Sequence, residues 1–192
     1  MRPFHFIGKC QSKTIKQQYN DYGVKLFDLR MRWHDGLWYI AHGSMIFDIT
    51  VAEAMADLEL LYHDERSWIA NPGKVYVRVL LEYNGDVSAG IKEKFKTKCA
   101  QLAADHTKFT FICGKLKSTW ETLYDFGNDL SIEEKHSSVT SLFDSDSKLL
   151  KVIDNWYPRL YAKLNNADIY KEGTEKECLL LDFIEIGYEN KK

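Results

Sequence analysis

The sequence predicts an α/β fold with a largely parallel sheet, because strand-like and helix-like segments alternate through the middle of the chain. Residues 75–83 (VYVRVLLEY) and 109–113 have the alternating pattern of strands, whereas residues 90–104 repeat apolar side chains at helical spacing. Strands that alternate with helices are typical of a parallel sheet covered by helices. A chain of 192 residues has the length of one domain, so we expect a single domain over residues 1–192.

The composition is typical of a soluble globular protein. Hydrophobic residues make up 45% and charged residues 28% of the chain, and no apolar run has the length of a signal peptide or a membrane span. A net charge of −2 argues against a nucleic-acid partner that is bound by neutralising its phosphates. Cys10, Cys99, Cys113 and Cys178 are widely spaced, which favours free thiols in a reducing, cytoplasmic type of compartment.

The stretch Gly23–Gly43 (GVKLFDLRMRWHDGLWYIAHG) predicts a β-hairpin that carries charged side chains. Its first half alternates, so that Asp28 and Arg30 share one face of a strand. A carboxylate and a guanidinium on an apolar strand are costly to bury unless they are paired or used. A turn at Asp35 then reverses the chain, and the returning strand ends with His42, whose side chain titrates near neutral pH.

The length of the turn decides which residue lies opposite Arg30. A two-residue loop of Asp35 and Gly36 would pair Arg30 with Ala41 and place His42 on the other face. A three-residue loop that includes the next leucine would set Arg30 opposite His42. The sequence leaves both registers open.

Caps and turn signals predict the remaining elements. Thr50 begins a capping box with Glu53, which predicts a helix from this point, and Ser12 can cap a short helix that Gly23 ends. A polar, serine-rich region over residues 127–148 indicates a loop followed by a capped helix that continues to residue 156. Further strands are expected over residues 120–126, in the segment YPRLYAKLNN (157–166) and in CLLLDFIEIG (178–187).

Several side chains near strand ends are candidates for binding an anionic substrate. In the strand 75–83 the apolar face would meet helices, and the other phase carries Arg78 and Glu82, as site residues or as an internal ion pair. A lysine just past the carboxyl end of a barrel strand suits an anion. The candidates for substrate binding are Arg78, Glu82, Lys115, Lys117 and Tyr124.

The first part of the chain resembles the X region of phosphatidylinositol-specific phospholipase C, and its bacterial, metal-independent branch in particular. The resemblance covers about residues 10–43 and returns weakly in the last third. It is carried by Gln11-Ser12, Thr14-Ile15, Gln18, the run GVKLFDLR (23–30) and the following His42-Gly43. The resemblance implies a TIM-barrel-like (β/α)8 fold. Such barrels typically need about 250 residues, so we expect one that is distorted or incomplete at the N-terminus.

The resemblance also implies a phosphodiesterase that cleaves an inositol phospholipid, or a related phosphodiester, through attack by the ring hydroxyl. His42 would be the general acid and Arg30 would stabilise charge at the phosphorus, with Asp28 steering Arg30. Asp182 resembles the aspartate of the final strand that orients the first catalytic histidine. Because Arg30 stands where the animal enzymes carry an acidic calcium ligand, no metal cofactor is expected.

The general base is the missing part of this set. Three possibilities remain open: His5 is the base, a histidine upstream of this sequence is the base, or the protein has no general base. An alternative is therefore an inactive relative that binds inositol phosphates or phospholipid headgroups, and an interaction protein on the same fold is a third reading. A metal-dependent glycerophosphodiester phosphodiesterase is disfavoured by Arg30. The expected partners are a phospholipid or inositol-phosphate substrate and transiently a membrane surface, with the protein itself a monomer.

Overall fold

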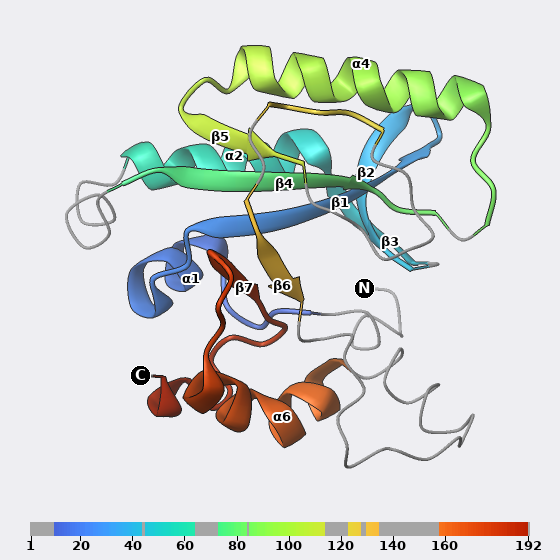
Figure 1. Cartoon of the computed structure of the whole chain (residues 1–192). Coiled ribbons are helices and arrows are strands. Elements are labelled where there is room, and N and C mark those ends of the chain that lie inside the picture. The colour runs from blue at the N-terminus through green and yellow to red at the C-terminus, as the bar shows by residue number, and fades with distance from the viewer. Residues whose placement is uncertain are drawn as a thin grey trace. The chain divides into compact units, whose positions relative to one another are not determined.

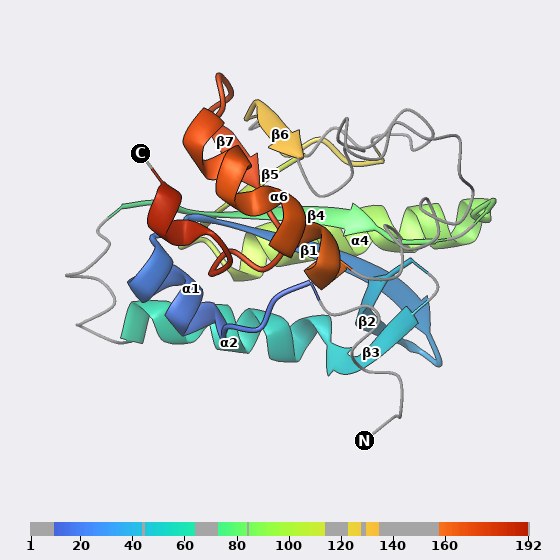
Figure 2. The same cartoon turned by 90° about the horizontal axis from the view of Figure 1, so that it is seen from below.

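The computed structural model describes residues 10–43, 45–63, 73–83, 85–113, 123–127, 130–134 and 158–191. Figures 1 and 2 show the chain in two views. It forms two compact units: Gly23–Leu130, and Met1–Tyr22 together with Ser131–Lys192. Among the described helices, none combines the length and the apolar character that crossing a membrane requires.

The unit Gly23–Leu130 is built on a mixed five-stranded sheet, which confirms the α/β class. The strands lie in the order β3-β2-β1-β4-β5; β1, β4 and β5 are parallel, and β2 is antiparallel to both β1 and β3. In the described residues β3 and β5 are the edges of this sheet, so a closed (β/α)8 barrel is not confirmed. The elements are β1 (Leu26–His34), β2 (Leu37–His42), β3 (Met45–Thr50), α2 (Val51–His63), β4 (Val75–Leu81), α4 (Ala89–Asp105) and β5 (Phe109–Ile112).

The hairpin between β1 and β2 has the two-residue loop. Asp35 and Gly36 both have positive φ angles, +44° and +83°, as a tight turn between twisted strands requires. The ladder then runs from His34 opposite Leu37 to Met31 opposite Ile40. Of the two registers that the sequence left open, this is the one with the two-residue loop, and the register that would set Arg30 opposite His42 is not formed.

Helices α2 and α4 cover the apolar face of the sheet, as the alternation predicted. Tyr62 of α2 packs edge-on against Phe109 of β5 at 5.1 Å between ring centroids, and Phe95 of α4 packs against Trp38 of β2 at 6.1 Å. Figure 1 shows α4 running beside β5, and Figure 2 shows α2 beneath β1. The charged phase of β1 and β4 therefore lies on the other face of the sheet.

Local capping signals set the start of two helices. The Thr50–Glu53 capping box is confirmed: Glu53 accepts the backbone N–H of Thr50 at 2.7 Å, and Thr50 Oγ1 accepts the N–H of Glu53 at 3.2 Å. Helix α1 (Ile15–Tyr22) begins later than expected, because Thr14 caps it in place of Ser12. Thr14 Oγ1 accepts the N–H of Gln17 at 3.2 Å, whereas the Ser12 hydroxyl donates to Glu185.

The other unit joins the two ends of the chain. It contains α1, a two-stranded parallel sheet of β6 (Ile132–Glu134) and β7 (Cys178–Leu180), α6 (Pro158–Glu172) and the short 3₁₀ helix η2 (Tyr188–Asn190). Gln11 donates to the carbonyl of Leu181 at 2.7 Å and accepts the N–H of Ile184 at 3.2 Å. The buried amide of Asn166 donates to the carbonyl of Asp182 at 2.9 Å.

The expectation of a strand over residues 157–166 was wrong, because this segment lies in helix α6 from Pro158 onward. Proline is favoured at the first helical position, where its missing N–H costs nothing. Ala162, Asn166, Ile169 and Tyr170 are buried at helical spacing. Asparagine occupies part of the buried face of this helix. The spacing of apolar residues alone therefore did not predict the helix.

Three other expectations also differ from the structure. The strand expected over residues 178–187 ends at Leu180, so Asp182 lies in the turn region that follows and not in the middle of a strand. Residues 123–126, the described part of the strand expected over 120–126, are not in a strand. β6 lies within the region expected to be loop. The helix expected to continue to residue 156 falls outside the described residues.

Candidate functional site

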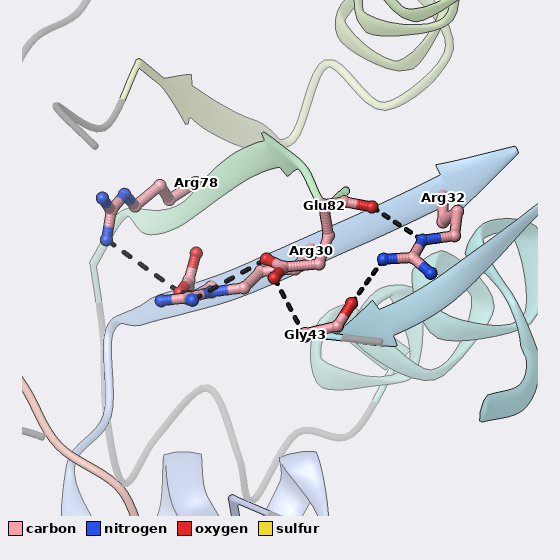
Figure 3. Close-up of polar contacts among 6 residues, drawn as sticks. Arg30, Arg32, Gly43, Arg78 and Glu82 are labelled. Atoms are coloured by element: carbon pink, nitrogen blue, oxygen red, sulfur yellow. Dashed lines mark hydrogen bonds and ion pairs between the residues drawn. The ribbon is translucent and has the colours of Figure 1, made fainter. Parts of the chain in front are cut away.

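A cluster of charged side chains lies on the polar face of β1 and β4. Asp28 and Arg78 are directly paired positions of these two parallel strands, and Arg30 and Arg32 follow Asp28 in the same alternating phase. Glu82 comes directly after the last residue of β4. Figure 3 shows Arg30, Arg32, Arg78 and Glu82 along β1 and the neighbouring strand β4. We call the set Asp28, Arg30, Arg32, Arg78 and Glu82 the charged cluster.

Arg30 lies between the two carboxylates of the cluster. Its Nε donates to Asp28 Oδ2 at 2.9 Å, and its NH1 lies 3.8 Å from Glu82 Oε2. The Arg30 side chain is 19% exposed, more than any other member of these ion pairs. A guanidinium held in this way is oriented before any ligand arrives.

Arg78 is fully buried and supports Asp28 from the neighbouring strand. Its NH1 lies 3.9 Å from Asp28 Oδ2, so one carboxylate oxygen faces two guanidinium groups. The ion pair of Arg78 is thus with Asp28, whereas Glu82, the partner that the sequence suggested, is paired with Arg30. A charge buried to this extent persists because it is compensated by its partner.

Glu82 is almost completely buried, with 5% of its side chain exposed. Its Oε1 accepts the backbone N–H of Gly43 at 2.9 Å. Burial raises the pKa of Glu82 above its ordinary value, while the charge of Arg30 and the Gly43 N–H oppose the rise. Within the described residues, Glu82 Oε2 and Asp28 Oδ1 are buried oxygens that accept no hydrogen bond.

Arg32 and Gly43 complete the arrangement, and the sequence analysis did not select either of them. Arg32 Nε donates to the carbonyl of Glu82 at 2.8 Å, and its NH2 donates to the carbonyl of Gly43. Its guanidinium also lies over the ring of Tyr83, 5.0 Å from the centroid. The alternation that selected Asp28 and Arg30 extends to Arg32, so this residue could have been found by following the same phase.

His42 is the last residue of β2, directly before Gly43, and is half-buried. The ladder between β1 and β2 has its last pair at Met31 and Ile40, and the pairing of β2 with β3 shifts register between Tyr39 and Ala41. His42 is opposite Met45 of β3, so its place along the sheet is set by β3 and not by the ladder between β1 and β2.

The other predicted site residues are not part of the charged cluster as described. Tyr124 packs edge-on against Phe126 at 4.7 Å, and its carbonyl accepts the thiol of Cys113 at 3.0 Å. Asp182 belongs to the unit formed by the two chain ends. Lys115, Lys117 and His5 lie outside the described residues.

Among the histidines that the structure describes, two have carboxylate partners outside the cluster. His34 lies 3.3 Å from Asp35 in the exposed hairpin turn, and His106 Nδ1 lies 2.9 Å from Glu59. His63 ends α2. A general base next to Arg30 is therefore not identified in the described part of the chain.

The charged cluster has the chemistry of an anion site. It contains three guanidinium groups and two carboxylates, and burial strengthens their interactions with a bound charge. In the described ranges, no three His, Cys, Asp or Glu side chains are grouped as a metal ligand set. No protein-family model matches the chain, and no curated protein matches it.

Proposed function

We propose that this protein is a phosphodiesterase resembling phosphatidylinositol-specific phospholipase C, which cleaves an inositol phospholipid or a related phosphodiester. The observation that carries the proposal is the Arg30 guanidinium, which Asp28 holds at 2.9 Å and which stays partly exposed. A transition state at phosphorus develops negative charge on its oxygens, and a preorganised guanidinium stabilises that charge.

The roles of the residues follow from this chemistry. Arg30 contacts the phosphate, and Asp28 orients Arg30. His42 protonates the departing alcohol oxygen. Arg78 is too deeply buried to contact a substrate, so its role is to hold Asp28 in place.

The proposal includes catalysis without a metal ion. The fixed positive charge of Arg30 supplies the electrostatic stabilisation and would repel a cation at the same place. A barrel-like architecture also belongs to the proposal. It is supported by the parallel strands β1, β4 and β5, whose connections contain α2 and α4 on one face.

The test is hydrolysis of phosphatidylinositol in mixed vesicles, measured in EDTA, for the wild-type protein and its Arg30→Ala, Arg30→Lys and His42→Ala variants. We expect turnover in EDTA and a loss of at least about a hundredfold in kcat for both alanine variants. Arg30→Lys keeps the charge but loses the planar guanidinium that Asp28 orients, so its activity should be little higher than that of Arg30→Ala. Glu59→Gln, which changes a carboxylate outside the charged cluster, is the matched control.

A second candidate function is binding of inositol phosphates or phospholipid headgroups without turnover. The observation that favours it is that, among the described residues, no histidine has been identified as a general base next to Arg30: His34 and His106 have carboxylate partners elsewhere. Calorimetric titration with an inositol phosphate separates the two candidates. Binding that Arg30→Ala abolishes, without hydrolysis by the wild-type protein, would establish the binding function and exclude the enzyme.

A further inference from the structure

The turn after β2 lies between the paired ends of β2 and β3, where His42 is opposite Met45, and side chains of the charged cluster hold it as well. The N–H of Gly43 donates to Glu82 Oε1 at 2.9 Å, and the carbonyl of Gly43 accepts from Arg32 NH2. Both backbone polar groups of this glycine are therefore bound by the charged cluster, as the dashed lines in Figure 3 show. Gly43 has a φ of +58°, a conformation that suits glycine.

The two side chains that hold Gly43 are themselves attached to the sheet. Arg32 Nε donates to the carbonyl of Glu82 at 2.8 Å, and the N–H of Glu82 donates to the carbonyl of Met31 at 2.9 Å. The ring of Tyr83 lies under the Arg32 guanidinium, and its hydroxyl donates to the carbonyl of Trp33 at 3.0 Å. These contacts restrict the motion of both side chains.

The residue directly before Gly43 is His42, which pairs with Met45 of β3 and lies beyond the last pair of the ladder between β1 and β2. The last pair between β1 and β2 is Met31 with Ile40, and β2 changes register against β3 after Tyr39. The hydrogen bonds of Arg32 and Glu82 thus attach the end of β2 to β1 and to the end of β4 where regular pairing with β1 has stopped.

We propose that Glu82 and Arg32 are positioning residues, which fix Gly43 and through it the place of His42 beside the strand that carries Arg30. Packing alone does not explain a carboxylate at position 82, because burying one is costly and its Oε2 accepts no hydrogen bond in the described residues. An apolar side chain there would avoid this cost but would leave the Gly43 N–H without an acceptor. The catalytic role of His42 in this inference rests on the proposed function. The fixing of Gly43 by Glu82 and Arg32 does not depend on that function.

The test is NMR spectroscopy of the full chain, in which the exchange of the Gly43 amide proton and the ring resonances of His42 are followed. In Glu82→Ala we expect exchange at Gly43 to accelerate by about tenfold, the effect of losing one hydrogen bond to a charged acceptor, and the His42 resonances to shift. Glu82→Gln keeps an oxygen acceptor and should recover part of both effects. Arg32→Met should move the same two signals, and Glu59→Gln should move neither.

Unchanged exchange at Gly43 and unchanged His42 resonances in Glu82→Ala would overturn the inference. If the wild-type protein hydrolyses phosphatidylinositol, a second measurement applies: Glu82→Ala should lower kcat more than it raises KM, because the acid is displaced whereas Arg30, which loses the 3.8 Å contact to Glu82, is still held by Asp28 at 2.9 Å. Equal effects on a stability assay and on kcat, with no change at His42, would mean that Glu82 is structural. Absence of turnover would refute the enzyme proposal. The NMR result would then still decide whether Glu82 and Arg32 fix Gly43.

Discussion

At the scale of single residues, the charged cluster combines groups that the sequence could identify with groups that it could not. Asp28 and Arg30 were selected because a strand alternates its side chains, and the structure pairs them at 2.9 Å. Gly43 was not selected for a contact, because it takes part through its backbone, and backbone contacts depend on how separate strands meet. The distance of 39 residues between Gly43 and Glu82 carries no local signal.

The buried carboxyl of Glu82 makes the stability of the folded protein fall as the pH rises. Burial raises the pKa of Glu82 above its ordinary value of 4.5, so the folded protein holds the proton more tightly than the unfolded chain does. The stabilisation linked to this group is present below about pH 4.5 and is lost as the pH rises through the raised value. Glu82→Gln is neutral throughout and escapes this loss.

We therefore expect the free energy of unfolding of Glu82→Gln to become larger, relative to that of wild type, as the pH rises across this window. Urea unfolding followed by tryptophan fluorescence at a series of pH values measures it. Glu59→Gln serves as the control for a carboxylate change elsewhere. A difference between Glu82→Gln and wild type that stays constant with pH would contradict the expectation.

At the scale of elements, prediction succeeded where a few neighbouring residues decide the structure. The Thr50–Glu53 capping box starts α2, and Asp35-Gly36 forms the tight turn of the hairpin. It failed for α6, because the buried face of that helix includes two asparagines whose role depends on distant partners. Asn166, for example, bonds the carbonyls of Asp182 and Phe183 from a position 16 residues before the first of them.

The contact between η2 and α6 gives a prediction with a matched control. A Cβ on Gly187 would lie 2.7 Å from the backbone nitrogen of Ala167, and Gly187 also has a φ of +75°. Gly173 has a similar φ of +71°, but a Cβ there would meet nothing within 4 Å. Gly173→Ala should therefore cost only the backbone strain, about 1 kcal/mol, whereas Gly187→Ala should cost roughly 3 kcal/mol or more.

Thermal or urea unfolding of the two variants tests this difference. Equal losses of stability would show that the close approach of η2 to α6 does not limit the side chain at position 187. A larger loss for Gly173→Ala than for Gly187→Ala would contradict the prediction.

At the scale of the whole molecule, the chain forms two compact units. One of them is made from both ends of the chain: the N–H of Phe183 donates to the carbonyl of Cys10 at 2.7 Å. Such a pairing could not be predicted from one sequence, because the two segments share no pattern and are separated by most of the chain. The central unit contains the alternating strands and helices, and there the α/β class was predicted correctly.

The cysteines offer a probe of unfolding for the whole molecule. All four are free thiols, as their spacing predicted. Cys99 is a fully buried residue of α4, and burial raises its pKa to about 12. We expect Cys99 to react with iodoacetamide at neutral pH only after unfolding, because the native protein offers neither access nor thiolate.

Mass spectrometry of the labelled peptides, with and without urea, checks this expectation. Labelling of Cys99 in native buffer, at the rate of an exposed thiol, would mean that α4 opens readily. The labelling rate across a urea series would otherwise report the opening of the central unit.

The sharing of Asp28 between Arg30 and Arg78 has a consequence for how this chain can change over generations. Removing one member of a buried ionic set leaves another charge without compensation, at a cost of about 3–5 kcal/mol, which is a large part of the stability of an ordinary domain. Single replacements at these positions would therefore be removed by selection, while paired replacements could persist. Among descendants of a common ancestor, positions 28, 30, 78 and 82 should covary, and the charged cluster should be inherited as one unit.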